Sequence, residues 1–379
     1  MAVPLLDLKA QYPPLQGAIR AALDRVLDSQ QFILGEEVAA FEREIGGWLD
    51  GGEAIGVASG TDALLLALMA LEIGEGDEVV TTPYSFFATA GAIHRVGARP
   101  VFADIDPRTF LMRPELAARA ITRRTRALLP VHLFGQMVEM EPLLEIARAR
   151  NLSVIEDAAQ AIGATTGFEG KTGQAGTLGT IGCFSFFPSK NLGGAGDGGL
   201  VVTRDAGLAD RIRSLRRHGE EAAYVHTRVG LNSRLDALQA AVLRVKLPHL
   251  DRWSAARAAN AQRYGRLFSG AGLAGPDSPL ILPETRPGAR HIFHQYVVRA
   301  RRRDDLLSHL RAASIGCAVY YPIPLHLQRC FAGLHHHPGD FPVAESASAS
   351  SLALPIYPEL TAAMQEEVVG VIREFYSSE

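Results

Sequence analysis

The chain has 379 residues, which is long enough for two domains with a large buried core. Its apolar content of 47%, charged content of 21% and formal net charge of −3 are ordinary for a globular enzyme, and they favour neither a nucleic-acid partner nor an anionic membrane surface. Cys183, Cys317 and Cys330 lie far apart and form neither a zinc-binding spacing nor a disulfide framework. Because the first residues also lack a signal-peptide pattern, we expect a cytoplasmic protein.

Strand and helix patterns alternate from Ala54 to Arg150, after a first helical pattern at residues 36–48. Apolar residues recur at helical spacing in some segments, and short runs of β-branched and aromatic residues separate them. One helical segment is apolar all round and should be buried. This alternation predicts a mainly parallel sheet with right-handed crossovers. The expected elements are helices at residues 36–48, 63–71 and 141–150 and strands at 54–58, 78–82, 100–104 and 127–132.

Two loops in this half could bind a ligand. Ser59 or Thr61 can cap the buried helix, and the free backbone N–H groups at its N-terminus can also bind an anion. A plain helix cap without a ligand is the alternative. After the strand at 78–82, Phe86 can stack on a flat ring or belong to the core, and we expect Phe87 to belong to the core. His132 ends a strand, and we expect it to be structural.

The stretch from Val154 to Thr203 contains the clearest chemical pattern. One strand, 153–157, ends at Asp157, and another, 181–187, leads through Pro188 and Ser189 to Lys190. Ligands of open α/β sheets bind at the carboxyl ends of the strands, so both side chains should face one ligand. Pyridoxal phosphate needs a lysine amine to form a Schiff base and an acid to keep its ring nitrogen protonated. A structural ion pair is the alternative.

Two strings in this stretch resemble the DegT/DnrJ/EryC1/StrS family of sugar aminotransferases. They are Glu156-Asp157-Ala158-Ala159-Gln160-Ala161 and Ser185-Phe186-Phe187-Pro188-Ser189-Lys190. The resemblance extends over essentially the whole chain. It implies an α/β protein of the aspartate-aminotransferase fold type I, with a mainly parallel central sheet flanked by helices. We expect a large cofactor-binding domain at residues 1–250 and a smaller C-terminal α+β domain at 251–379.

The resemblance also implies the site residues. Lys190 would carry pyridoxal 5′-phosphate and transfer the proton, and Asp157 would face the ring nitrogen. The other implied cofactor contacts are Gly60, Thr61, Ser185 and Asn232 at the phosphate, Phe86 against the ring and Gln160 near the phenolic oxygen. Asn232 would reach the phosphate of a partner subunit, which implies a homodimer with shared sites. Arg234, Tyr321 and His326 are the implied substrate contacts.

Patterns in the C-terminal half are weaker. We expect a long helix interrupted near Pro248, capped by Asn232 or Ser233, and an extended loop at 320–326. His335–His337 lack a carboxylate or cysteine spaced to complete a metal site, so we expect an exposed loop and no metal. Further helices are expected at 211–220, 304–313 and 359–376 and a strand at 294–299.

The resemblance implies transfer of an amino group from L-glutamate to a keto sugar nucleotide. The strings 229–236 and 321–326 resemble the branch that aminates C3, whose substrates are a dTDP-3-keto-6-deoxyhexose or UDP-2-acetamido-3-keto-glucuronate. Arg234 could bind a uronate carboxylate or a diphosphate oxygen. The alternatives are a 4-keto sugar nucleotide aminotransferase, a sugar dehydratase and a non-catalytic regulatory or binding protein. The presence of Lys190 opposes the dehydratase, since such relatives replace this lysine.

Overall fold

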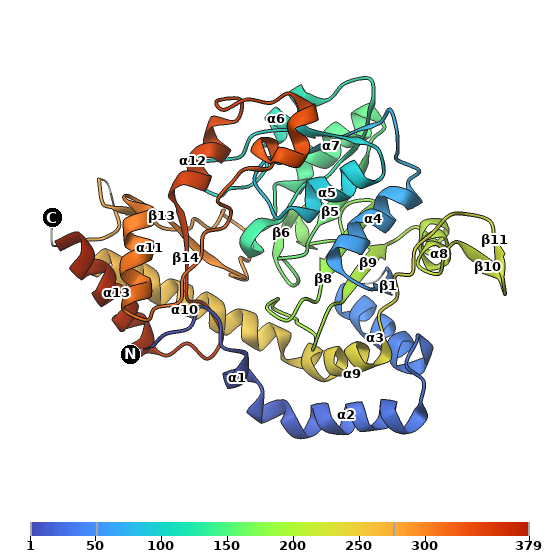
Figure 1. The fold of residues 1–379 in the computed structure, drawn as a ribbon, viewed down its shortest axis with the longest axis horizontal. Helices are drawn as coiled ribbons and strands as arrows, with labels where there is room; N and C mark the ends of the chain where they lie inside the picture. The colour runs from blue at the N-terminus through green and yellow to red at the C-terminus, as the bar shows by residue number, and fades with distance from the viewer. Residues whose placement is uncertain (1, 51, 276, 378–379) are drawn as a thin grey trace.

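The computed structural model describes residues 2–50, 52–275 and 277–377. A seven-stranded sheet with the order β1-β9-β8-β5-β4-β2-β3 lies at the centre of the larger part of the molecule (Figure 1). Within this sheet β9 runs antiparallel to both of its neighbours, and the other pairs are parallel. The expected mainly parallel sheet is therefore confirmed. Its strands are β1 (Glu53–Val57), β2 (Glu78–Thr81), β3 (Arg99–Phe102), β4 (Thr125–Leu128), β5 (Ser153–Asp157), β8 (Ile181–Ser185) and β9 (Gly199–Thr203).

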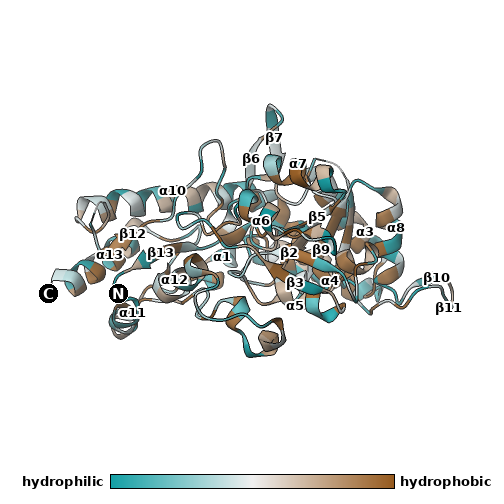
Figure 2. Ribbon diagram, turned by 90° about the horizontal axis from the view of Figure 1, so that it is seen from above, coloured by the Kyte–Doolittle hydropathy of each residue, from teal (hydrophilic) through white to brown (hydrophobic). Residues whose placement is uncertain are grey.

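Helices cover this sheet, as its buried strands require. The helix at residues 60–70 is buried all round, as its continuous apolar sequence predicts, and the Ser59 hydroxyl caps it by accepting the backbone N–H of Asp62 at 3.1 Å. Figure 2 shows hydrophobic residues concentrated around the central strands. The helices around the sheet are α3 (Gly35–Trp48), α4 (Gly60–Ala70), α5 (Ala88–Arg95), α6 (Pro114–Ala120), α7 (Met140–Arg150) and α8 (Ala206–Leu215).

A long helical segment runs from below the large sheet to the C-terminal part of the molecule (Figure 1). It consists of α9 (Ala237–Lys246), the short 3-10 helix η3 (Leu247–His249) and α10 (Leu250–Gly270). The interruption coincides with Pro248, because proline has no N–H for the helical ladder. The N-terminal helix α2 (Gln16–Ser29) packs on α9 through a small apolar cluster around Trp253. Two short helices, α1 (Leu8–Gln11) and η1 (Pro13–Leu15), precede α2.

The C-terminal part contains a second apolar core around a three-stranded antiparallel sheet. Val3 belongs to this core and pairs with Ile315, although it lies at the other end of the chain. The domain division near residue 250 stays a prediction. The elements here are β12 (Leu280–Ile281), β13 (Tyr296–Ala300), β14 (Ser351–Leu354), α11 (Arg303–Ala312), η4 (Leu325–Leu327), η5 (Arg329–Leu334), α12 (Pro342–Ser350) and α13 (Ala362–Ser377).

Two hairpins project from the body of the molecule (Figure 2). They are β6–β7 (Thr165–Phe168 and Lys171–Gln174) and β10–β11 (Glu220–Ala222 and Val225–His226). In the second hairpin and the loop after it, Tyr224 is 94% exposed and Val229 is 91% exposed. Within the described ranges 2–50, 52–275 and 277–377, no helix is both long and apolar enough to cross a membrane.

Three local predictions were wrong. The helix expected at 211–220 is α8, which begins after its cap Asp205 and ends before a turn in which His218 and Gly219 have positive φ values of 61° and 77°. The cap of α9 is Asp236, whose carboxylate accepts the Gln239 N–H at 2.8 Å, and neither Asn232 nor Ser233 has this role. Phe87 is 46% exposed and stacks on Phe331 instead of entering the core.

Candidate active site

Asp157 and Lys190 lie at the carboxyl ends of neighbouring parallel strands. Asp157 is the last residue of β5 and pairs in register with Cys183 of β8. After β8 the chain turns back, and the Lys190 N–H donates to the Phe187 carbonyl at 2.8 Å. Burial lowers the pKa of Lys190 to about 8, and the nearby Asp157 charge opposes this shift. The structure therefore places a readily deprotonated amine beside a carboxylate.

The Asp157 carboxylate is held at both oxygens. Its Oδ2 accepts from the Thr89 hydroxyl at 2.8 Å, and its Oδ1 accepts from the Ala159 N–H at 3.2 Å. Burial raises the pKa of Asp157, while the Thr89 hydroxyl, the Ala159 N–H and the Lys190 charge each act to lower it. Sequence reasoning missed Thr89, although its spacing of four residues from Ser85 was a usable signal for a pair of facing hydroxyl groups.

Gly60, Thr61 and Ser185 gather where the N-terminus of α4 meets the end of β8. A Cβ built on Gly60 would lie 2.6 Å from the Ser185 Cβ, so only glycine fits this contact. Thr61 is exposed, and Ser185 is half-buried with its Oγ 3.3 Å from the Phe187 N–H. The helix N-terminus and the two hydroxyls together suit a phosphate group.

Gln160, Tyr321 and Phe86 form the next wall. The Gln160 Nε2 donates to the Tyr321 hydroxyl at 2.9 Å, and its Oε1 accepts the Phe134 N–H at 2.8 Å. Phe86 is 57% exposed, and its ring centroid lies 6.4 Å from that of Tyr321. The loop that contains Tyr321 docks on the end of β2, since the Leu325 N–H donates to the Pro83 carbonyl at 2.7 Å.

Two residues behind Lys190 were not identified from the sequence. The His294 Nδ1 lies 3.2 Å from the Asn191 Oδ1, and the Asn191 Nδ2 donates to the Ile292 carbonyl at 3.2 Å. Burial lowers the pKa of His294, and the charges of Lys190 and Arg257 add to that effect. These contacts tie the lysine loop to the start of β13. The two segments are too far apart in the chain for any spacing signal.

The predicted phosphate and substrate residues Asn232 and Arg234 lie beside the projecting β10–β11 hairpin. Asn232 is exposed and forms an isolated β-bridge with Arg217, whereas the buried Ser233 hydroxyl accepts the Ala58 N–H at 3.2 Å. Arg234 is half-buried and forms no ion pair within the part of the chain that the structure describes. Both side chains are therefore available to a ligand or a partner.

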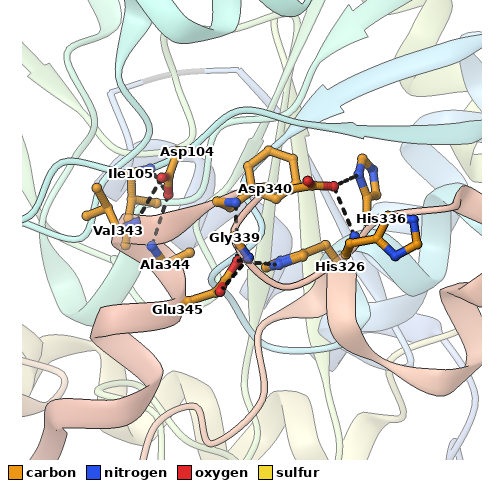
Figure 3. Close-up of polar contacts among 11 residues, drawn as sticks. Asp104, Ile105, His326, His336, Gly339, Asp340, Val343, Ala344 and Glu345 are labelled. Carbon is orange, nitrogen blue, oxygen red and sulfur yellow. Dashed lines mark hydrogen bonds and ion pairs between the residues drawn. The ribbon is translucent and has the colours of Figure 1, made fainter.

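Figure 3 shows His326 pointing toward Glu345 and Gly339. Its ring is buried, with Nε2 3.1 Å from the Glu345 Oε1 and the Phe341 ring centroid 4.7 Å away. The same carboxylate accepts the Gly339 N–H at 2.9 Å. His326 thus joins the Tyr321 loop to α12, and its role as a substrate contact stays a prediction. The neighbouring His335 and His337 are exposed, as expected of a loop, whereas His336 is half-buried with its Nδ1 3.2 Å from the Asp340 Oδ2.

His132 is a structural residue, as expected. Its Nε2 lies 2.7 Å from the Glu156 Oε2, its Nδ1 accepts the Val138 N–H at 3.2 Å, and both side chains are fully buried. The Glu156 carboxylate also accepts backbone N–H groups from Gly176, Leu178 and Gly179. Glu156 therefore anchors the sheet, whereas the carboxylate of its neighbour Asp157 accepts from Thr89 and Ala159.

The gathered groups fit pyridoxal phosphate. The fit rests on the half-buried Lys190 amine with its lowered pKa, the doubly held Asp157 carboxylate and the Gly60 contact that leaves no room for a Cβ. The exposed ring of Phe86 and the hydroxyls at the α4 N-terminus complete a site for a flat, anionic molecule.

Comparisons with known proteins agree with this geometry. The model of the DegT/DnrJ/EryC1/StrS aminotransferase family matches residues 14–373. The chain is 48% identical to a "Pleiotropic regulatory protein" of Geobacillus stearothermophilus, over 99% of each chain. It is 45% identical to a UDP-N-acetyl-3-dehydro-α-D-glucosamine 3-aminotransferase of Acidithiobacillus ferrooxidans, over 98% of this chain and 97% of the relative. It superposes on S. venezuelae DesV, solved in complex with a ketimine intermediate, with a TM-score of 0.93 and 44% identity. The superposition covers 99% of this chain and 98% of DesV.

Proposed function

The chain belongs to the DegT/DnrJ/EryC1/StrS aminotransferase family and uses pyridoxal phosphate, and we propose that it transfers an amino group from L-glutamate to C3 of a nucleotide-linked keto sugar. The observation that carries the proposal is the placement of the buried Asp157 at the end of β5 and of Lys190 on the loop after the neighbouring parallel strand β8, where each charge affects the pKa of the other. The name of the Acidithiobacillus relative supports C3 as the position and a nucleotide sugar as the acceptor. A dTDP-3-keto-6-deoxyhexose and a UDP-3-keto sugar, including the glucuronate, are the candidate acceptors.

The residues of this chain have distinct roles in such a reaction. When bound, pyridoxal phosphate supplies an aldehyde that takes up the amino group and a ring that accepts electrons. Lys190 would hold it covalently at rest and, once displaced by the amino donor, would carry the proton. With its pKa lowered to about 8, a useful fraction of the Lys190 amine is unprotonated near neutral pH.

The remaining site residues would orient the cofactor. Asp157, held by Thr89 and Ala159, would keep the ring nitrogen protonated. Gly60, Thr61 and Ser185 would receive the phosphate at the α4 N-terminus. We expect Phe86 to cover the ring and Gln160, fixed between Phe134 and Tyr321, to lie beside the phenolic oxygen.

The acceptor is tested by a panel of sugar nucleotides. The protein is first loaded with the amino group from L-glutamate and then offered 3-keto and 4-keto sugars on dTDP and on UDP, with the position of the new amine read by NMR. Amination at C3 supports the proposal, and a clear preference for a 4-keto sugar contradicts it. A regulatory role, which the name of the Geobacillus relative raises, predicts no amination with any member of the panel.

Arg234 separates the two kinds of 3-keto substrate. Because a guanidinium binds a carboxylate in a bidentate way, Arg234→Ala should lose activity with a uronate and keep it with a neutral sugar. Arg373→Ala, which removes an exposed guanidinium from α13, is the control for general effects of charge. If Arg234→Ala lost activity equally with both sugars, Arg234 would instead bind the diphosphate or hold its own loop in place.

We propose a homodimer in which Asn232 completes the partner's phosphate site. The exposed Asn232 and the exposed Tyr224 and Val229 of the adjacent hairpin segment support this proposal, since apolar side chains this exposed favour burial against another chain. Mixing Lys190→Ala with Asn232→Ala subunits should restore one intact site per heterodimer. No recovery under conditions of subunit exchange would contradict shared sites.

A cytoplasmic location is also proposed. Cys183, Cys317 and Cys330 are all free thiols, which fits a reducing compartment. Cell fractionation with an antibody to the protein tests this, and recovery outside the cytoplasmic fraction would contradict it.

A further inference from the structure

Two hydroxyl groups on the loop and helix after β2 continue the contacts of Asp157. The Ser85 Oγ lies 2.9 Å from the Thr89 Oγ1, which in turn lies 2.8 Å from the Asp157 Oδ2. All three side chains are buried, and Thr89 is fully so. Thr89 stands in the first turn of α5, four residues after Ser85, so both hydroxyls are fixed by one short segment.

The charge of Asp157 decides which hydroxyl donates in each of these two hydrogen bonds. An ionised carboxylate can only accept, so the single hydrogen of the Thr89 hydroxyl must point at Oδ2. Thr89 then has only lone pairs left for Ser85, so the Ser85 hydroxyl must donate to Thr89. While Asp157 is ionised, both hydrogen bonds can therefore form only if Ser85 donates to Thr89 and Thr89 donates to Asp157.

Among the groups that stabilise the Asp157 charge, the Thr89 hydroxyl has the largest effect. Burial raises the pKa of this carboxyl, and after that the Thr89 hydroxyl has the largest effect, ahead of the Ala159 N–H, Lys190 and His132. Two further titratable groups face it, the thiol of Cys183 and the hydroxyl of Tyr321, and both are neutral donors with pKa values raised by burial. A hydrogen bond to a buried charged group is among the stronger ones in proteins.

We propose that Thr89 is the positioning residue that keeps the Asp157 carboxylate ionised and fixed in orientation, with Ser85 ordering the Thr89 hydroxyl. This role rests on the proposed function in that Asp157 serves the cofactor ring. Thr89 itself acts through Asp157. Pyridoxal phosphate therefore binds to a site whose counter-charge is already in place.

The test is the affinity of the full-length protein for pyridoxal phosphate as a function of pH, which does not require amino transfer. Thr89→Val keeps the shape of the side chain and removes the hydroxyl. If only ionised Asp157 favours binding, the variant should match wild type near about pH 9 and bind about 10- to 100-fold more weakly near about pH 5. The direction follows because loss of the donor raises the pKa of Asp157, so the carboxyl takes up a proton at a higher pH.

Three further variants separate positioning from packing. Thr89→Ser retains the hydroxyl and should restore the wild-type pH dependence. Thr81→Val is the matched control. The buried hydroxyl of Thr81, the last residue of β2, donates to the Leu129 carbonyl at 2.8 Å and not to Asp157, so this variant should show no pH-dependent deficit. Ser85→Ala leaves Thr89 in place, so its deficit should have the same sign and be smaller.

The outcomes decide the proposal without reference to the sugar acceptor. A deficit that grows as the pH falls, in Thr89→Val and to a smaller extent in Ser85→Ala, supports it. An unchanged affinity in Thr89→Val, or a deficit equal at every pH, would overturn it. If Thr89→Val does not fold, the Ser85→Ala profile decides by the same criterion. Failure to aminate any keto sugar would count against the proposed function alone.

Discussion

The Gln160 Nε2 donates a hydrogen bond to the Tyr321 hydroxyl at 2.9 Å and so joins the end of β5 to the loop before η4. The amide cannot flip without losing the bond from the Phe134 N–H to Oε1. Tyr321→Phe would therefore leave a buried amide N–H without its acceptor, and we expect kcat/KM to fall by about tenfold. Steady-state kinetics check this, with Tyr376→Phe, a change in the terminal helix α13, as the control. Equal kinetics of wild type and Tyr321→Phe would mean that the contact is incidental.

Gly60→Ala should weaken cofactor binding. The new methyl group would collide with the Ser185 Cβ, so α4 or β8 must move at the phosphate site. We expect a loss of about 1–3 kcal/mol in the free energy of unfolding and a matching decrease in affinity for pyridoxal phosphate. Gly265→Ala is the control, because it lies in α10 with nothing near its Cβ, and it should stabilise the protein by up to about 1 kcal/mol. If both variants bound the cofactor as wild type does, the Gly60 contact would not shape the site.

Glu156→Gln should be strongly destabilising even though it is close in shape. The carboxylate accepts from His132 and Gly176 on one oxygen and from Leu178 and Gly179 on the other. An amide nitrogen cannot accept from either pair, and buried donors would lose their partners. We expect a cost of about 3–5 kcal/mol in the free energy of urea unfolding. A cost below about 1 kcal/mol would show that the pocket readily rearranges.

Acid should destabilise the protein partly through His291. Burial lowers the pKa of this residue to about 3, so the folded state binds a proton less readily than the unfolded chain. The neutral ring contributes stability that is present above the unfolded value of about 6.5 and is lost as the pH falls toward 3, by up to about 1.4 kcal/mol per pH unit. His291→Asn keeps an acceptor for the Phe293 N–H, which His291 Nδ1 accepts at 2.9 Å. Between about pH 6 and pH 4 the free energy of urea unfolding should fall less in the variant than in wild type. The same pH dependence in both proteins would contradict this.

The framework of the large sheet could be predicted because its strands are short apolar runs that end in turn residues. Burial on both faces leaves such runs recognisable without knowledge of their neighbours, and β5 and β8 were found within two residues of their observed ends. The interruption at Pro248 was equally clear, since its cause is local. The ends of helices were harder to predict. Asn232, Ser233 and Asp236 are all good caps, and the structure uses Asp236 for α9 while the Ser233 hydroxyl accepts the distant Ala58 N–H.

The contacts within the site depend on segments that the sequence does not relate. Thr89 and Asp157 are joined by a hydrogen bond across 68 residues, and Asn191 and His294 across 103. The contact of the His326 ring with Glu345 of α12 is of the same kind, since nothing in the string around His326 indicates it. The exposure of Phe87 has the same origin, because its stacking partner Phe331 comes from a distant 3-10 helix. Such pairs become visible only once the chain has folded.

The role of Lys190 as the covalent anchor is tested most directly by finding which lysine binds the cofactor. The lysines of the chain are Lys9, Lys171, Lys190 and Lys246. Lys246 is a demanding competitor, since it is buried, burial lowers its pKa to about 8, and its amine contacts the Gly193 carbonyl next to the lysine loop. Lys246 lies over Trp253, with its amine 5.8 Å from the ring centroid.

The measurement is reduction of the cofactor-loaded protein with borohydride, followed by digestion and mass spectrometry. Reduction converts the bond between the lysine nitrogen and the cofactor aldehyde into a stable amine, so the labelled lysine keeps the added mass. We predict the pyridoxyl phosphate mass on the peptide that contains Lys190 and its absence from the Lys246 peptide. Label on Lys246, or no label on any lysine of a protein that binds the cofactor, would contradict the assignment of Lys190.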